Sequence, residues 1–453
     1  MELRRSRSVG AVLVTLVALV LVIRPASGVS SKPPADKPRN VILFIVDGMG
    51  PGEIELGRRM NGGSLFIDSI PWEVKGTLET SSLDGVTDSA AGATALASGV
   101  ETHNGWLGMV PTAGGAMPVE TALERAQDRG KATALISDSY ITDATPAGFA
   151  AHVTSRSQLQ TIATQMAGQG IEFLMGGGLR QGSVAPLQDL PGVSYVSSAA
   201  ELDAYVTGGG AGPVYGFFDS WNMVYNLDRD DESVAGADPT LPRMTSAALS
   251  VLSKDPDGFF LMVEGGLVDW GGHARDGALV GTEMIEADDA VRAAWRFARD
   301  RTDTLILFTA DHETGALRLS SETDIAGLSG QTASTEYMWG LIGKGAPIAQ
   351  TVATYTGITN LTSGERATIR ACGETGISDV LGARWKISWG GGAALTKAST
   401  RSSRFRSGRG VRGLPTSPGA STRMNAWERT SSGTSHRISA SDVVRCKELP
   451  YLA

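Results

Sequence analysis

Four short apolar runs, each followed at once by acidic or hydroxyl residues, constrain the fold of this chain more than any other feature. They span residues 41–46, 132–136, 259–263 and 304–308. Runs that are apolar almost without interruption are typical of strands covered on both faces of a sheet. A helical pattern lies between the last two, at 284–299, where apolar residues recur every three or four positions. We therefore predict a three-layer α/β/α sandwich with a large, mostly parallel central sheet.

The polar residues that follow these runs include metal-ligating types. They are Asp47 after the first run, Asp143 and Thr145 after the second, Glu264 after the third, and Asp311 and His312 after the fourth. Because ligands bind beyond the carboxyl ends of parallel strands, we expect these side chains to meet at one edge of the sheet. Asp269 and His273, four residues apart, supply a further carboxylate and imidazole, enough to hold one metal.

Carboxylates and imidazoles are ligands that zinc takes when one position stays open, and the oxygens of Glu264 and Thr145 suit magnesium. Any one of these residues also fits a plainer role, since a strand-end aspartate is often a turn former or helix cap. Suitable ligands at four separate strand ends are hard to explain by coincidence. The sequence therefore predicts a metal site.

Ser89 lies between an acid and a run of small residues, within 86–94. Asp88 is a good N-cap, and the first-turn N–H groups beyond it attract an anion. The plainer alternative is an ordinary capped, alanine-rich helix. Combined with the strand-end acids, Ser89 is a candidate nucleophile at the start of a helix. Arg156 has the fork geometry that binds a phosphate.

The N-terminus has the pattern of an export signal over residues 1–28. Three arginines precede an apolar run at 11–23, and small residues at 26–28 offer a cleavage site. The run is short for a membrane span, which needs about 20 apolar residues. We predict a periplasmic or extracellular protein with no stable membrane insertion after cleavage. An uncleaved anchor is the alternative.

Composition limits the partner classes. The chain has 453 residues, of which 42% are hydrophobic and 19% charged, as in soluble globular proteins. Its net charge of -8 argues against nucleic acid as the main partner. Cys372 and Cys446 are the only cysteines. They are too few for a disulfide framework or a cysteine-based metal site, and leave room for a single bridge.

Changes in composition along the chain suggest its organisation. Residues 29–39 are a linker and 40–392 form the main domain. Within it, 181–242 is expected to be an irregular insertion, with a triple glycine and an acidic run. Residues 393–453 are an atypical tail rich in arginine, serine and glycine.

The motifs together resemble the alkaline phosphatase family, in the family's order from about residue 40 to 389. The resemblance rests on the strand and Asp-Gly-Met-Gly turn at 41–51, on Asp88-Ser89-Ala90 and its continuation to 100, on 143–148 with 151–156, on Glu264-Gly265 with Asp269 and His273, and on 309–315.

The resemblance implies two Zn²⁺ and one Mg²⁺ per subunit, and a role for each matching residue. Asp47 would bridge one zinc and the magnesium. Asp311 and His312 would be further ligands of that zinc, which would also bind the Ser89 oxygen, and Asp269 and His273 would bind the other zinc. Thr145 and Glu264 would bind magnesium, with Asp143 supporting it through water. Asp88, Ser89 and Arg156 would contact the substrate, with Arg156 clamping the phosphate. His152 would be structural.

The implied activity is hydrolysis of small phosphate monoesters through a phosphoserine intermediate. A related phosphodiesterase is an alternative, as is a catalytically impaired homologue that binds phosphate or metal. No Cys/Ser-x-Pro-x-Arg signature of sulfatases occurs in the chain. A homodimer is implied by the resemblance alone.

The chain departs from the family pattern near its C-terminus. The family has one more histidine, in a His-Thr step, as third protein ligand of the Asp269/His273 zinc. After His312 the only histidine is His436, and 390–396 reads GGGAALT. We interpret the sequence of residues 393–453 as the result of a shift of reading frame near Gly392, with a disordered basic tail as the alternative. We expect no strand there, which would leave a sheet edge exposed.

Overall fold

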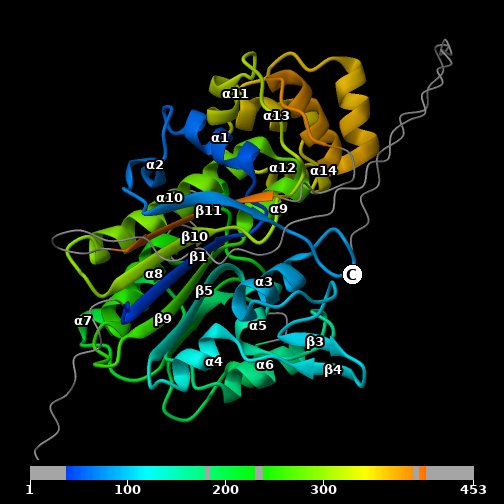
Figure 1. The fold of residues 1–453 in the computed structure, drawn as a ribbon. Coiled ribbons are helices and arrows are strands. Elements are labelled where there is room, and N and C mark those ends of the chain that lie inside the picture. Colours follow the sequence, from blue (N-terminus) through cyan, green and yellow to red (C-terminus); the bar gives the residue numbers. More distant parts are fainter. Residues whose placement is uncertain (1–36, 179–183, 230–237, 391–396, 405–453) are drawn as a thin grey trace, which may run out of the picture. The chain divides into compact units, whose positions relative to one another are not determined.

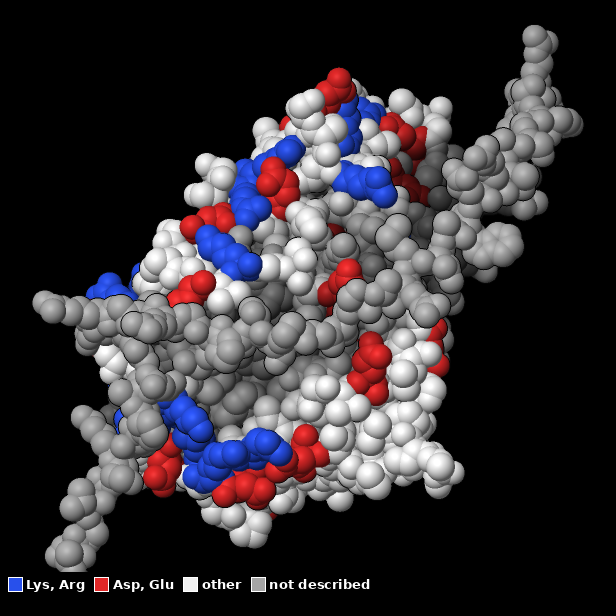
Figure 2. Space-filling view, viewed as in Figure 1, with Lys and Arg blue, Asp and Glu red and all other residues white. Residues whose placement is uncertain are grey.

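The computed structural model describes residues 37–178, 184–229 and 238–390, together with the backbone of 397–404. The predicted export signal, most of the linker, His436 and Cys446 lie outside the described residues. No helix in these ranges is both long and apolar enough to cross a membrane. On the face shown in Figure 2, basic and acidic side chains are interspersed.

The described residues form a nine-stranded sheet in the order β2-β11-β10-β1-β9-β5-β6-β8-β7 (Figure 1). Its strands are β1 (Asn40–Val46), β2 (Val74–Glu79), β5 (Ala132–Tyr140), β6 (Phe173–Gly177), β7 (Ser194–Val196), β8 (Val214–Phe217), β9 (Phe259–Gly265), β10 (Thr304–Thr309) and β11 (Lys397–Arg404). From β10 to β7 all neighbours pair in parallel. All four predicted apolar strands are present, as β1, β5, β9 and β10.

Helices cover both faces of the sheet (Figure 1). One face carries α1 (Pro51–Met60), α2 (Phe66–Ser69), α7 (Ala199–Thr207), α8 (Leu241–Leu252) and α10 (Gly277–Ala298); the other carries α3 (Ser89–Ser98), α4 (Ala122–Gln127), α5 (Ala144–Ala150) and α6 (Leu159–Gly168). Further helices are α9 (Leu267–Ala274), α11 (Ile325–Ser329), α12 (Thr335–Gly343), α13 (Ile348–Thr356) and α14 (Ser363–Trp385), and β3 (Met109–Thr112) pairs with β4 (Gly115–Pro118).

The residues of β1 show how one strand joins both layers. Ile42, Phe44 and Val46 belong to the core on the α8/α10 side, whereas Leu43 and Ile45 belong to the core on the α3/α5 side. Successive side chains of a strand point to opposite faces, so a continuous apolar run is what a doubly covered strand requires. The predicted three-layer sandwich is confirmed.

The prediction of an irregular segment over 181–242 is wrong for its central part. There β7, α7 and β8 extend the parallel sheet, with β8 pairing both β6 and β7. These strands have only three and four residues. A strand that short is too brief for its own hydrophobic period to be recognised, and its regularity comes from pairing with a longer neighbour.

The prediction that no strand follows Gly392 is also wrong. β11 runs antiparallel between β10 and β2, with Leu305 opposite Arg404 and Lys397 opposite Glu79. Its sequence, KASTRSSR, has no apolar face. Backbone N–H and C=O groups of two flanking strands specify this pairing, which a search for hydrophobic alternation misses.

The packing of α2 provides a test of the fold. Asp288 on α10 accepts hydrogen bonds from the backbone N–H groups of Phe66 (2.6 Å) and Ile67 (2.8 Å). Asp288→Ala is expected to lower the free energy of unfolding by about 1–3 kcal/mol, because these groups lose a buried acceptor. Urea unfolding measures the change. Asp289→Ala, at the more exposed neighbouring position, is the matched control, and an equal loss in both variants would contradict this assignment.

Candidate active site

The carboxyl ends of β10, β1, β9 and β5 bring the predicted acids together. In the parallel register Ile45 lies opposite both Glu264 and Thr309, and Ser137 lies opposite Glu264. Asp47 and Asp311 each follow their strand by one or two residues, so they lie at the same edge as Glu264. The predicted meeting of strand-end side chains is present.

The turn after β1 can only be made by glycine. Gly48 has φ of +75°, and a Cβ there would lie 2.7 Å from Cα of Asp269. Glycine adopts this left-handed conformation without a steric penalty. The turn therefore lets the first part of α9, which carries Asp269, pack directly against the backbone beside Asp47.

Ser89 is the first residue of α3, as the N-cap pattern predicts. Asp88 caps the helix by accepting a hydrogen bond from the Ala91 N–H at 3.0 Å. The Ser89 side chain faces inward, with only 5% of the residue exposed, and its Oγ lies 3.1 Å from Nε2 of His312. The serine hydroxyl therefore points at the strand-end acids.

A potential metal-binding group lies directly beside this serine. Asp47, Asp269 and His312 each offer one ligand atom, and these atoms lie within 4.8 Å of one another. His312 Nε2 is also 3.6 Å from Oδ2 of Asp311. Thr314 holds the group in place, because its hydroxyl hydrogen-bonds to Asp269 and lies 3.2 Å from Nδ1 of His312.

Glu264 and Thr145 form the part of the site predicted to bind magnesium. Both are fully buried. Glu264 Oε2 accepts a hydrogen bond from Ser137 at 2.5 Å, while its Oε1 and the Thr145 hydroxyl have no hydrogen-bond partner in the described structure. Ser139 donates to Asp143 at 2.9 Å. Sequence reasoning missed Ser137 and Ser139, which orient the acids.

The electrostatics of this edge show what the acids lack. Burial raises the pKa of Asp47 well above its usual range, and Asp311 and Asp269 raise it further. Burial, then Asp143 and Asp47, do the same to the pKa of Glu264. Burial and Asp269 raise the pKa of Asp311 to about 7. Buried carboxylates this close together need a cation to stay charged.

Unsatisfied oxygens test whether metal ions fit. One carboxylate oxygen of Asp47 and one of Asp311 are buried without a hydrogen-bond partner in the described residues, as are Glu264 Oε1 and the Thr145 hydroxyl. Such orphaned acceptors are rare in native structures. Hard or borderline cations take oxygen and imidazole ligands of this kind, so the residues present fit Zn²⁺ and Mg²⁺.

The second predicted zinc position is more open. His273 Nε2 lies 3.4 Å from Asp269 Oδ2, and 67% of the His273 side chain is exposed. The other three described histidines are engaged elsewhere: His312 beside Ser89, His103 with Asp84, and His152 with Glu124 and the Gly108 carbonyl. Within the described residues this position therefore has a carboxylate and one imidazole.

Arg156 lies between two acids beside the nucleophile. Its Nη2 is 2.8 Å from Oδ1 of Asp143 and its Nη1 is 3.5 Å from Oδ2 of Asp88. Its backbone N–H donates to the Gly105 carbonyl at 2.7 Å, and Gly105 in turn donates to Asp88. The guanidinium is thus oriented next to the start of α3, where an anion would bind.

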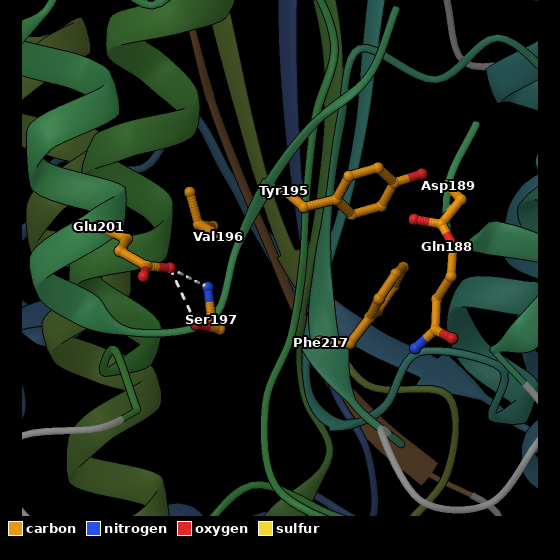
Figure 3. Close-up of a pocket in the computed structure, with 7 residues that line it drawn as sticks. All are labelled: Gln188, Asp189, Tyr195, Val196, Ser197, Glu201 and Phe217. Atoms are coloured by element: carbon orange, nitrogen blue, oxygen red, sulfur yellow. Dashed lines mark hydrogen bonds between the residues drawn. The ribbon is translucent and has the colours of Figure 1, made fainter. Parts of the chain in front are cut away.

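A separate hollow of about 310 Å³ lies at the β7–β8 edge of the sheet (Figure 3). Tyr195 and Phe217 line it on one side and Glu201 with Ser197 on another. None of the predicted site residues lines this hollow. The chemistry-bearing residues are at the strand ends instead.

Comparisons with known proteins agree with the site. The family model "Alkaline phosphatase" matches residues 38–356. The repressible alkaline phosphatase of Saccharomyces cerevisiae is 33% identical over 380 residues, which cover 74% of this chain and 64% of the yeast protein. The chain therefore spans just under two thirds of that relative.

Two solved structures are similar as well. The alkaline phosphatase of Thermus thermophilus matches with a TM-score of 0.72 and 25% identity, over 81% of this chain and 86% of that one. A mutant of TAB5 alkaline phosphatase, described with bound Mg, has a TM-score of 0.54 and 30% identity, over 63% and 80%. All predicted site residues fall within 38–356, so the chain belongs to the alkaline phosphatase family.

Proposed function

We propose that this protein hydrolyses small phosphate monoesters to an alcohol and inorganic phosphate, with Ser89 as the nucleophile. The observation that carries the proposal is the 3.1 Å approach of Ser89 Oγ to His312 Nε2, beside buried acids that each have a carboxylate oxygen without a hydrogen-bond partner in the described residues. Membership of the family and the names of its relatives support the same activity.

The metal complement in this proposal is two Zn²⁺ and one Mg²⁺. Asp47, Asp311 and His312 would hold one zinc, Asp269 and His273 would hold the other, and Glu264, Thr145 and Asp47 would hold magnesium, with Asp143 nearby. When bound, these ions lower the pKa of the serine hydroxyl and neutralise charge on the phosphate oxygens.

The residues of the chain position the reacting groups. Ser89 Oγ gives up its proton and forms a bond to phosphorus while the bond from phosphorus to the leaving oxygen breaks, and that oxygen takes up a proton, giving an alcohol and a phosphoserine. A water oxygen then forms a bond to the same phosphorus while the bond to Ser89 Oγ breaks, and one proton of the water restores the serine hydroxyl as inorganic phosphate forms. Arg156 and the first-turn N–H groups of α3 stabilise the equatorial phosphate oxygens in both steps.

One observation favours a second candidate, a homologue that binds phosphate and metal but turns over poorly. Among the described residues we assign only Asp269 and His273 to the second zinc, and His273 is largely exposed. Losing a residue that only orients a metal ligand typically lowers metal affinity or activity 10–100-fold, and losing a ligand itself lowers them as well.

The location and assembly are further parts of the proposal. We infer export to the periplasm or the extracellular space from the signal pattern at 1–28, and a homodimer from the family resemblance. A mature chain whose first peptide starts after residue 28, identified by mass spectrometry of the exported protein, would support the first. An intact residue 1 in that protein would contradict it.

Ser89→Ala is expected to reduce p-nitrophenyl phosphate turnover by a factor on the order of 10³ or more, because no nucleophile is left for the first step. Steady-state kinetics with Zn²⁺ and Mg²⁺ present measure the loss. Ser98→Ala, on the same helix, is the matched control and keeps its activity. Acid quenching with labelled substrate traps label on Ser89 in the wild type. Equal turnover in the wild type and Ser89→Ala would exclude this serine.

Removal of metal is expected to destabilise the folded protein as well as inactivate it. A ligand that binds only the folded state stabilises it by about 2.7 kcal/mol at 100 times its Kd. Chelator treatment should therefore lower the melting temperature, and added Zn²⁺ and Mg²⁺ should restore it. This readout also detects metal in a protein that turns over poorly.

Asp47→Asn is expected to remove more than one metal equivalent, because Asp47 is assigned to both a zinc and the magnesium. Mass spectrometry of metal content in the purified protein measures this loss. Asp289→Asn, on the outer side of α10, is the control and keeps the full complement. A full complement in Asp47→Asn would show that the ions lie elsewhere.

A further inference from the structure

Three aromatic side chains lie in a row beside the strand-end acids, and no step proposed above uses them. Tyr140 ends β5, Trp221 lies in the loop after β8, and Trp270 directly follows Asp269 on α9. The ring centroids of Tyr140 and Trp221 are 4.8 Å apart at an interplanar angle of 40°. Those of Trp221 and Trp270 are 6.5 Å apart at 88°. We call this row the aromatic wall.

The wall connects directly to the residues that would hold the phosphate. The Tyr140 hydroxyl hydrogen-bonds to Asp143, and Asp143 binds Arg156 at 2.8 Å. At the other end, Trp270 shares a helix with Asp269 and His273. The wall therefore begins beside the residues proposed to clamp the phosphate and ends on the helix that carries the more open metal position.

The loop that carries Trp221 is held in a fixed position. The Met223 N–H donates to the Asp138 carbonyl at 3.0 Å, and Ser139 donates to Asn222 at 3.2 Å. The Trp221 carbonyl packs so closely on Gly177 that a Cβ there would collide with it. A surface ordered before binding loses less entropy when a ligand arrives.

The outer part of the wall is accessible. Trp221 is 41% exposed, whereas Tyr140 and Trp270 are half-buried. An indole that is fixed by its neighbours and still exposed offers a flat apolar surface. Stacking on such a ring stabilises planar π systems and does little for a flexible aliphatic alcohol.

We propose that the aromatic wall binds the leaving group of the substrate and favours phosphate monoesters whose leaving group carries a planar aromatic ring, such as aryl phosphates and nucleoside monophosphates. This inference rests on the proposed phosphatase function for its kinetic consequences. Tyr140 orients Asp143, Trp221 stacks on the leaving group, and Trp270 supports the Trp221 ring edge-on. Trp221 is therefore a specificity residue that makes no contact with phosphorus.

A binding experiment tests the wall without requiring turnover. Phenylphosphonate and methylphosphonate share the anionic group and differ in the aromatic ring, and calorimetry with metal-loaded protein gives both affinities. The wild type is expected to bind phenylphosphonate at least about fivefold more tightly, as one stacked ring allows. Trp221→Ala should bring that ratio close to one while leaving methylphosphonate binding unchanged.

Two further variants make the result specific. Trp221→Phe keeps an aromatic face and should retain most of the preference. Tyr337→Ala removes another exposed aromatic residue, on α12, and should change neither affinity. A wild type that binds phenylphosphonate no better than methylphosphonate would overturn the proposal, as would an equal preference in the wild type and Trp221→Ala.

Kinetics separate this proposal from the function on which it rests. In Trp221→Ala, kcat/KM should fall about fivefold or more for p-nitrophenyl phosphate and adenosine 5′-monophosphate, and less than about twofold for glycerol 3-phosphate. Equal losses for all three substrates would contradict the wall. A wild type that hydrolyses none of them contradicts the phosphatase function instead, while the phosphonate ratio still decides the wall.

Discussion

The convergence of buried carboxylates at one edge of the sheet is the constraint on which the rest of the structure depends. Because β10, β1, β9 and β5 pair in parallel, their carboxyl ends all lie at this edge. Burial and mutual repulsion raise the pKa of Asp47, Glu264 and Asp311. Uncompensated buried charge is expensive, so this edge is stable in its ionised form only with cations in place. The same arrangement thus links folding, metal binding and the position of Ser89.

The sequence predicted those parts of the fold in which the residue types themselves indicate whether a segment is buried or where a helix begins. β1 and β9 contain uninterrupted apolar runs, at 41–46 and 259–263, because both of their faces are covered, and α3 begins where Asp88 can cap it. β7 and β11 could not be found in this way. The first has three residues, and the second is polar, so both depend on backbone partners that are distant in the sequence.

The candidate site divides along the same line. Asp47, Asp311 and His312 were predictable because each lies within three residues of the end of an apolar strand. Thr314 and Ser137 act only through the acids they orient, and a hydroxyl residue gives no such signal by itself. Thr314 does fall within the 309–315 motif, which is the one sequence feature that could have identified it. The exposure of His273 depends on what packs around α9, which no local pattern encodes.

The two predicted zinc positions are unequal, and α9 connects the weaker one with the aromatic wall. His312 is buried and contacts Thr314 and Ser89, whereas His273 is largely exposed beside Asp269. Trp270 directly follows Asp269 on α9, and its ring meets that of Trp221 edge-on with the centroids 6.5 Å apart. The helix that carries the less well-supported metal position therefore also supports one side of the aromatic wall.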